Sequence, residues 1–122
     1  GRRILSEKAV AEMESDQVGK AKINPNEFVE RARGNKHNGI YGLGMWREEL
    51  NETGIATLIS SPSWAGTYPW IDKRTSIRGV IMAHVDTGSE SLKRDKFSGF
   101  WSSPVIATMV RSQLAAAPSD KP

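Results

Sequence analysis

The 122-residue sequence predicts an α+β fold in which an antiparallel sheet is flanked by helices. Helical patterns occur near both ends of the chain, whereas β-branched and aromatic residues concentrate in its middle. Two strand-like runs in this middle part, residues 66–71 and 77–85, lie on either side of the polar turn 72–76. That arrangement is typical of a β-hairpin, and it is the strongest local signal in the chain.

We expect three strands, at residues 40–48, 64–71 and 77–85, to form one contiguous sheet. The third run is nearly continuous in apolar residues, which predicts a central strand covered on both faces. Pro69 cannot donate a backbone hydrogen bond, so it is expected at a bulge or where its missing N–H would face no partner. We interpret residues 55–59 as the approach to the hairpin.

Two helices are predicted. The first covers residues 7–17, because Ser6 is a good N-cap and apolar residues then recur on one helical face. The second covers residues 103–115, with Pro104 at its first position. Its expected buried stripe consists of Ile106, Met109, Val110 and Leu114.

Composition excludes several classes of function. The chain has no cysteine, which rules out disulfides and cysteine-rich zinc sites. Its net charge is +3, but the 17 basic residues are scattered and not interleaved with aromatic side chains, so we expect no nucleic-acid binding. No apolar run is long enough for a membrane span. His84 and Asp86 would share one face of a strand, but two ligands do not make a metal site, and we predict none.

Three motifs occur in an order that resembles a known family. They are GRRILS at residues 1–6, YGLGMW at residues 41–46, and SSPSWAGTYPWID at residues 60–72 followed by an apolar strand. Together they resemble the C-terminal part of serine hydrolases related to class C β-lactamases and penicillin-binding-protein-like esterases. The resemblance implies a β-lactamase/transpeptidase-like fold, of which residues 1–116 are the C-terminal segment. Residues 117–122 are expected to be a flexible tail.

The resemblance also implies an enzyme that acts through an acyl-enzyme. In this family the nucleophilic serine and its lysine lie on an upstream helix, and no Ser-x-x-Lys occurs in the 122 residues. We therefore expect this chain alone to be inactive, with no catalytic residue of its own. No cofactor is implied.

The chain departs from the family at the position of the Lys-Thr-Gly motif. That position falls near residues 58–61, where neither lysine nor histidine stands. Ser60 and Ser61 could still supply hydroxyl groups, and Trp64 and Tyr68 could wall a pocket. These four residues are the candidate substrate-binding residues, and without the cation an ester or amide substrate is favoured over a β-lactam.

Two alternatives stay open. The chain could belong to a non-catalytic binding or interaction module on the same scaffold, and aromatic packing explains Trp64 and Tyr68 as well as a pocket does. The expected partners are the N-terminal remainder of the same domain or a second copy of the chain, because a very apolar strand needs more cover than three strands supply. The compartment is not indicated.

Overall fold

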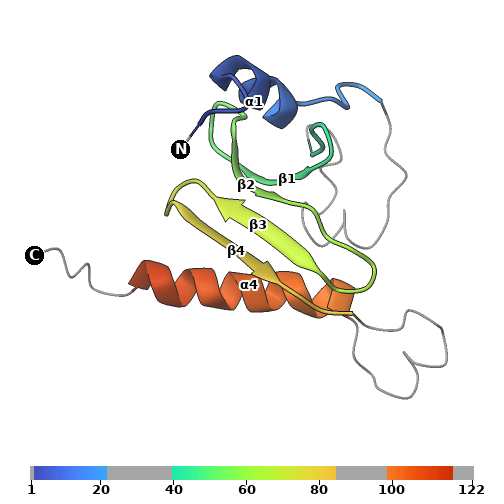
Figure 1. Ribbon diagram of the computed structural model, residues 1–122, viewed down its shortest axis with the longest axis vertical. Coiled ribbons are helices and arrows are strands. Elements are labelled where there is room, and N and C mark those ends of the chain that lie inside the picture. Colours follow the sequence, from blue (N-terminus) through green and yellow to red (C-terminus); the bar gives the residue numbers. More distant parts are fainter. Residues whose placement is uncertain (1, 22–39, 85–98, 117–122) are drawn as a thin grey trace, which may run out of the picture.

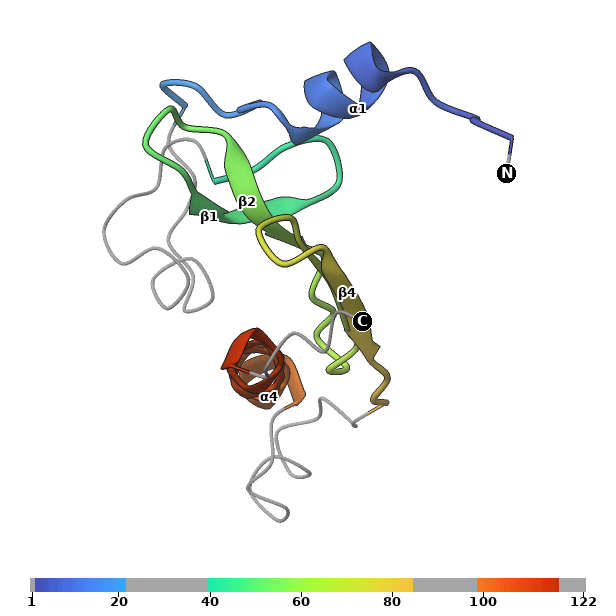
Figure 2. The same ribbon diagram turned by 90° about the vertical axis from the view of Figure 1, so that its left-hand side faces the viewer.

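The computed structural model describes residues 2–21, 40–84 and 99–116. Its elements, in chain order, are α1 (Glu7–Glu14), β1 (Trp46–Leu50), β2 (Ala56–Ser60), β3 (Tyr68–Asp72), β4 (Ile77–Ile81) and α4 (Gly99–Ala116). The strands form one antiparallel sheet in the order β1-β2-β3-β4. Helix α4 lies along β3 and β4 (Figure 1), and Figure 2 shows it end-on beside the sheet, with α1 close to β1 and β2. The predicted α+β class is confirmed.

The hairpin is the element that the sequence predicts best. Strands β3 and β4 pair from Tyr68 with Ile81 to Asp72 with Ile77. Asp72 stabilises the turn, because its Oδ1 accepts hydrogen bonds from the backbone N–H groups of Arg74 (3.0 Å) and Thr75 (3.4 Å). Pro69 lies just beyond the last residue pair of β2 and β3, Ser60 with Trp70. Its lack of an N–H therefore removes no hydrogen bond from within the paired residues of these two strands.

The prediction of three contiguous strands is wrong, because a fourth strand separates two of them. Strand β2 lies between β1 and β3 and pairs with both, from Trp46 with Ser60 on one side to Leu58 with Asp72 on the other. Strand β1 also begins later than residue 40. The preceding residues turn back on themselves instead, with the Gly42 N–H donating to the Met45 carbonyl and Gly44 at a φ of 74°.

Within the described residues, the third run is not the central strand covered on both faces that the sequence predicts. Strand β4 is the last strand of the sheet as described, and it ends at Ile81. Val80 and Met82 keep 53% and 85% of their surface exposed. A continuous apolar run therefore indicates a strand whose two faces both tend to be buried. Within the described residues, only α4 packs on β4, and it covers one face.

Helix α4 begins at Gly99, so Pro104 lies inside it and not at its first position. The predicted buried stripe is wrong as well. Side chains facing the sheet are instead Ser103, Ala107 and Arg111, each four residues apart and at most 8% exposed. The stripe residues are 40–64% exposed: Ile106 42%, Met109 64%, Val110 40% and Leu114 50%.

Helix α1 starts as predicted and ends earlier. Ser6 is its N-cap, with Oγ accepting from the Ala9 N–H at 3.1 Å. The helix stops at Glu14 and buries no residue; an ion pair between Glu14 and Lys73 joins it to the β3–β4 turn. The predicted tail, residues 117–122, lies outside the described residues.

The core lies between the sheet and α4. It consists of Leu58 from β2, Tyr68 and Trp70 from β3, and Ala107 from α4, with Trp46 and Ile81 packed against them. The Trp70 ring covers Gly79 so closely that a Cβ atom there would lie 2.3 Å from a ring carbon. A glycine is therefore required at this position of β4.

Replacing Arg111 by methionine should destabilise the fold strongly, because buried Asp72 would keep only the longer contact, at 3.8 Å, with the exposed Arg74. The expected loss in the free energy of unfolding is about 3–5 kcal/mol. Arg74→Met is the matched control, since Arg74 is exposed and also pairs with Asp72 and Glu49; it should cost less than about 1 kcal/mol. Urea unfolding of both variants measures the difference, and equal losses would show that α4 is not held by Arg111.

Candidate functional site

The candidate site is built on a β-bulge in β1. The pairing of β1 with β2 shifts register between Arg47 and Glu49 and again between Glu49 and Leu50, so Glu48 has no partner residue in β2. In a regular strand, Glu48 and Glu49 would point to opposite faces. The bulge instead lets both carboxylates reach the α4 side of the sheet, where each makes its own set of contacts.

Glu48 joins the first three strands through one atom. Its Oε1 accepts a hydrogen bond from the Tyr68 hydroxyl at 2.7 Å and another from the Ser60 hydroxyl. Both donors are buried, at 2% and 4% exposure. Burial raises the pKa of Glu48, and the neighbouring charge of Glu49 adds to this, while the two hydroxyl donors and Arg111 act in the opposite direction. Burial and the Glu48 charge likewise raise the pKa of Tyr68, so its phenol stays a hydrogen-bond donor.

Glu49 and Asp72 hold α4 through Arg111. The guanidinium donates to Asp72 Oδ2 from Nε at 2.8 Å and from Nη2 at 2.7 Å, and to Glu49 Oε1 from Nη1 at 3.0 Å. Burial opposes the ionisation of Asp72, but the hydrogen bonds and charge of Arg111 outweigh it and lower the pKa of that carboxyl. Sheet and helix are therefore joined by a charge pair shielded from water.

The structure separates the four predicted substrate-binding residues into two pairs. Ser60 and Tyr68 meet at Glu48, on the buried side of the sheet. Ser61 is exposed and lines a hollow of about 210 Å³, with Met45, Ile59, Pro69 and Ile71 among its walls. Trp64 lies in the loop between β2 and β3 with 68% of its surface exposed. Ser61 and Trp64 are thus the exposed members of the four, although Ser60 also borders the hollow.

This geometry decides what each hydroxyl can do. A nucleophilic serine needs a base, access for the substrate and an oxyanion hole. Ser60 has a carboxylate partner, but it is 4% exposed and its hydroxyl is already donated to Glu48. Ser61 has access, and its backbone N–H already donates to the Pro69 carbonyl at 3.2 Å. Among the described residues, neither Ser60 nor Ser61 therefore meets the requirements of a nucleophile.

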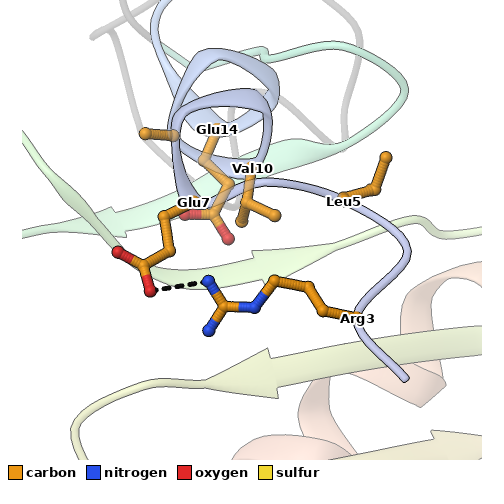
Figure 3. A pocket seen from close by; sticks show the side chains of 6 residues that line it. Arg3, Leu5, Glu7, Val10 and Glu14 are labelled. Carbon is orange, nitrogen blue, oxygen red and sulfur yellow. Dashed lines mark hydrogen bonds and ion pairs between the residues drawn. The ribbon is translucent and has the colours of Figure 1, made fainter.

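A second hollow, of about 400 Å³, lies beside α1 and is wide open to solvent. Figure 3 shows Leu5 and Val10 on its apolar side and Arg3 paired with Glu7 at 2.7 Å. That ion pair is exposed, so this hollow offers no buried polar group to orient a ligand. Across the described ranges, no cluster of three or more His, Asp or Glu side chains could hold a metal ion. None of the helices described is both long and apolar enough to cross a membrane.

Sequence analysis missed the charged residues on which the site is built: Glu48, Glu49, Asp72 and Arg111. A visible signal existed for one of them, because Arg111 continues the four-residue spacing of Ser103 and Ala107 on α4. The apolar residues beside that row, however, predict a different buried stripe. Glu48 carried no such signal, since a bulge cannot be recognised from one charged pair in a strand.

The chain is closely similar to a solved structure. That structure is the crystal structure of a "putative beta-lactamase from Bacteroides dorei DSM 17855", with 46% sequence identity and a TM-score of 0.80 over 94% of this chain. The chain has a β-lactamase-like fold. It spans 34% of the length of that protein. No protein-family model matches the sequence, and neither does any curated protein.

The β-lactamase-like fold places the described sheet and α4 within a larger architecture, and this agrees with the apolar surfaces that they leave exposed. Val80 and Met82 on the β4 side, and Met109 on α4, are more than half exposed. Such surfaces are typical of an interior that further chain covers.

Stability should depend on pH in two opposite ways. The raised pKa of Glu48 means that its contribution is fully present below its ordinary value of 4.5 and is lost as the pH rises through the folded-state value. The lowered pKa of Asp72 means that its contribution is present above its ordinary value of 3.8 and is lost as the pH falls through the folded-state value. The free energy of unfolding should therefore increase as the pH is lowered from 7 toward 4.5. It should decrease again once the pH lies well below 3.8.

Glu48→Gln tests the first part, because glutamine does not titrate. Thermal unfolding from pH 4.5 to 8 should show the variant gaining stability over the wild type as the pH rises, while Glu52→Gln, in the exposed β1–β2 turn, tracks the wild type. A Glu48→Gln variant that runs parallel to the wild type at every pH would show that the Glu48 carboxyl titrates normally.

Proposed function

We propose that this chain forms one wall of the substrate cleft of a serine hydrolase related to class C β-lactamases and penicillin-binding-protein-like esterases. The observation that carries the proposal is the 46% identity to a putative beta-lactamase over 94% of this chain. The three sequence motifs, at residues 1–6, 41–46 and 60–72, support it. In this proposal the nucleophilic serine, its lysine and the acyl-enzyme belong to a segment outside the 122 residues.

The chain's own contribution is to bind and orient the substrate. Ser61 offers an exposed hydroxyl at the edge of an apolar hollow, and Trp64 offers a large exposed ring three residues further on. A hydroxyl that donates to a substrate carbonyl and a ring that packs on its acyl or alcohol group together fix the reacting bond. Ser60 and Tyr68 support this wall from behind, through Glu48.

The proposed substrate is a neutral ester or amide. A β-lactam carries a carboxylate, and recognition of a carboxylate is strongest with a lysine, arginine or protonated histidine close by. Residues 58–61 read Leu-Ile-Ser-Ser and supply no cation. The hollow beside Ser61 is lined mostly by apolar side chains, which favours an uncharged acyl or alcohol group.

A non-catalytic binding module on the same scaffold is the second candidate. The observation in its favour is that two of the four candidate hydroxyl and aromatic residues are engaged in the fold. Ser60 and Tyr68 both donate to Glu48 and are at most 4% exposed. A module of this kind would keep the wall and bind a ligand without converting it.

Hydrolysis and covalent labelling distinguish the serine hydrolase from the binding module. Both are measured on the natural-length protein, meaning the whole protein of which these 122 residues are proposed to be a part. We expect turnover of 4-nitrophenyl butyrate and an intact-mass increase with a fluorophosphonate on a serine of a Ser-x-x-Lys motif upstream of Gly1, with little turnover of nitrocefin. Ser61→Ala should lower kcat/KM for the ester by about tenfold, as expected for the loss of one hydrogen bond to substrate. Ser112→Ala is the matched control, because Ser112 bonds only within its own helix.

The 122-residue chain by itself is the second control, and it should hydrolyse nothing. Its exposed apolar residues on β4 and α4 are proposed to meet the remainder of the same domain or a second copy of the chain. Sedimentation of the isolated chain should therefore show self-association. Ester hydrolysis by a monomer of the 122 residues would refute two claims: that the nucleophile lies outside them, and that their exposed apolar residues need a partner. A natural-length protein with neither ester turnover nor fluorophosphonate label would favour the binding module.

A further inference from the structure

The loop between β2 and β3, residues 61–67, carries both exposed side chains of the proposed wall, Ser61 and Trp64. Its flanking residues, Ser60 and Tyr68, donate to the same atom, Oε1 of Glu48. A carboxylate oxygen can accept two hydrogen bonds at once. One carboxylate oxygen from β1 therefore links the two residues that flank this loop.

The rest of the loop is tied down at its base and exposed at its tip. Ser103 of α4 donates from Oγ to the Gly66 carbonyl at 2.6 Å, and Thr67 donates from Oγ1 to the Ala83 carbonyl at 2.8 Å. Within the loop, the Ser63 N–H donates to the Thr67 carbonyl at 2.8 Å, and the Gly66 N–H to the Ser63 carbonyl at 2.9 Å. Trp64, at the tip, keeps 68% of its surface exposed. A fixed base and an exposed tip suit a ligand-contacting segment.

We propose that Glu48 is the positioning residue of this wall: it sets the conformation of residues 61–67, and thereby the placement of Ser61 and Trp64, without touching the substrate. This inference rests on the proposed function for its consequence in catalysis, but not for its structural part. Glu48 suits the role because its carboxyl group keeps oxygen lone pairs that can accept both hydrogen bonds whether it is ionised or protonated. Water cannot replace it, since Ser60 and Tyr68 are both buried.

The proposal depends on one oxygen atom, so it distinguishes isosteric variants. Glu48→Gln keeps a carbonyl oxygen that can accept from both hydroxyls, and it should keep the loop in place. Glu48→Leu has a similar volume and no acceptor, and it should release the loop. Asn51→Ala is the matched control on the other turn of β2, because Asn51 Oδ1 accepts from the N–H groups of Thr53 (3.1 Å) and Ile55 (2.8 Å) and has no contact with residues 61–67.

Hydrogen exchange in the natural-length protein measures the loop directly. The reporters are the hydrogen-bonded amides of Ser61, Ser63 and Gly66. Glu48→Leu should speed their exchange by about tenfold, the loss expected for a buried hydrogen bond, while Glu48→Gln leaves them near the wild-type rate. Asn51→Ala should speed exchange at Thr53 and Ile55 only.

Kinetics with 4-nitrophenyl butyrate add a readout that general destabilisation would not give. Glu48→Leu should raise KM and lower kcat/KM, Glu48→Gln should restore both, and Asn51→Ala should leave both unchanged at equal loss of thermal stability. If Glu48→Leu does not fold, Tyr68→Phe replaces it, since that variant removes one of the two donors and keeps the ring.

Two results would overturn the inference. One is unchanged exchange at Ser61, Ser63 and Gly66 in a folded Glu48→Leu or Tyr68→Phe protein. The other is faster exchange at these amides with wild-type KM. A natural-length protein that hydrolyses no ester would refute the proposed function instead, and the exchange rates would then decide the role of Glu48 by themselves.

Discussion

The bulge in β1 turns two adjacent carboxylates, Glu48 and Glu49, toward the same side of the sheet, and the rest of the described structure depends on what they bind. Glu48 holds the ends of the β2–β3 loop, and Glu49 shares Arg111 with Asp72. Burying carboxylates is costly unless each is paired or hydrogen-bonded. Here every strand from β1 to β3 contributes a partner, so the polar contacts fix the relative placement of three strands and α4 while the small apolar core fills the space between them.

This arrangement explains why α4 packs through small and charged residues. Arg111 needs to reach Asp72 and Glu49, and Ser103 needs to reach the Gly66 carbonyl, so the row between them must face the sheet. Ala107, midway along that row, lets the helix approach Trp70 and Tyr68 closely. The larger apolar residues of α4 are consequently turned away from the sheet, toward the solvent-exposed side of the described structure. The putative beta-lactamase that this chain resembles is about three times as long, and apolar surfaces of this kind are typical of protein interfaces.

The sequence predicted those features that depend on local patterns. The hairpin, the start of α1 at Ser6 and the α+β class follow from turn residues, capping and periodicity, which act over a few neighbouring residues. Strand β2 was missed because its five residues, Ala56–Ser60, follow closely on the exposed β1–β2 turn and lack the alternation of a half-buried strand. The α4 stripe was misassigned because hydrophobicity alone cannot show which face a buried ion pair will claim. Among the four candidate substrate-binding residues, the sequence could not separate the exposed Ser61 and Trp64 from the buried Ser60 and Tyr68, since that division depends on a bulge in another strand.

In the proposed function, residues 61–67 form a substrate wall whose base is fixed by polar contacts of Glu48, Ser103 and Thr67. A crystal structure of the natural-length protein after reaction with a butyl fluorophosphonate tests this most directly. We predict a phosphonylated serine outside the 122 residues, with the butyl group in contact with Ser61 or Trp64 and with Ser60 and Tyr68 still bonded to Glu48. A phosphonate whose alkyl group lies away from residues 61–67, or one bound to Ser60 or Ser61 itself, would contradict the account.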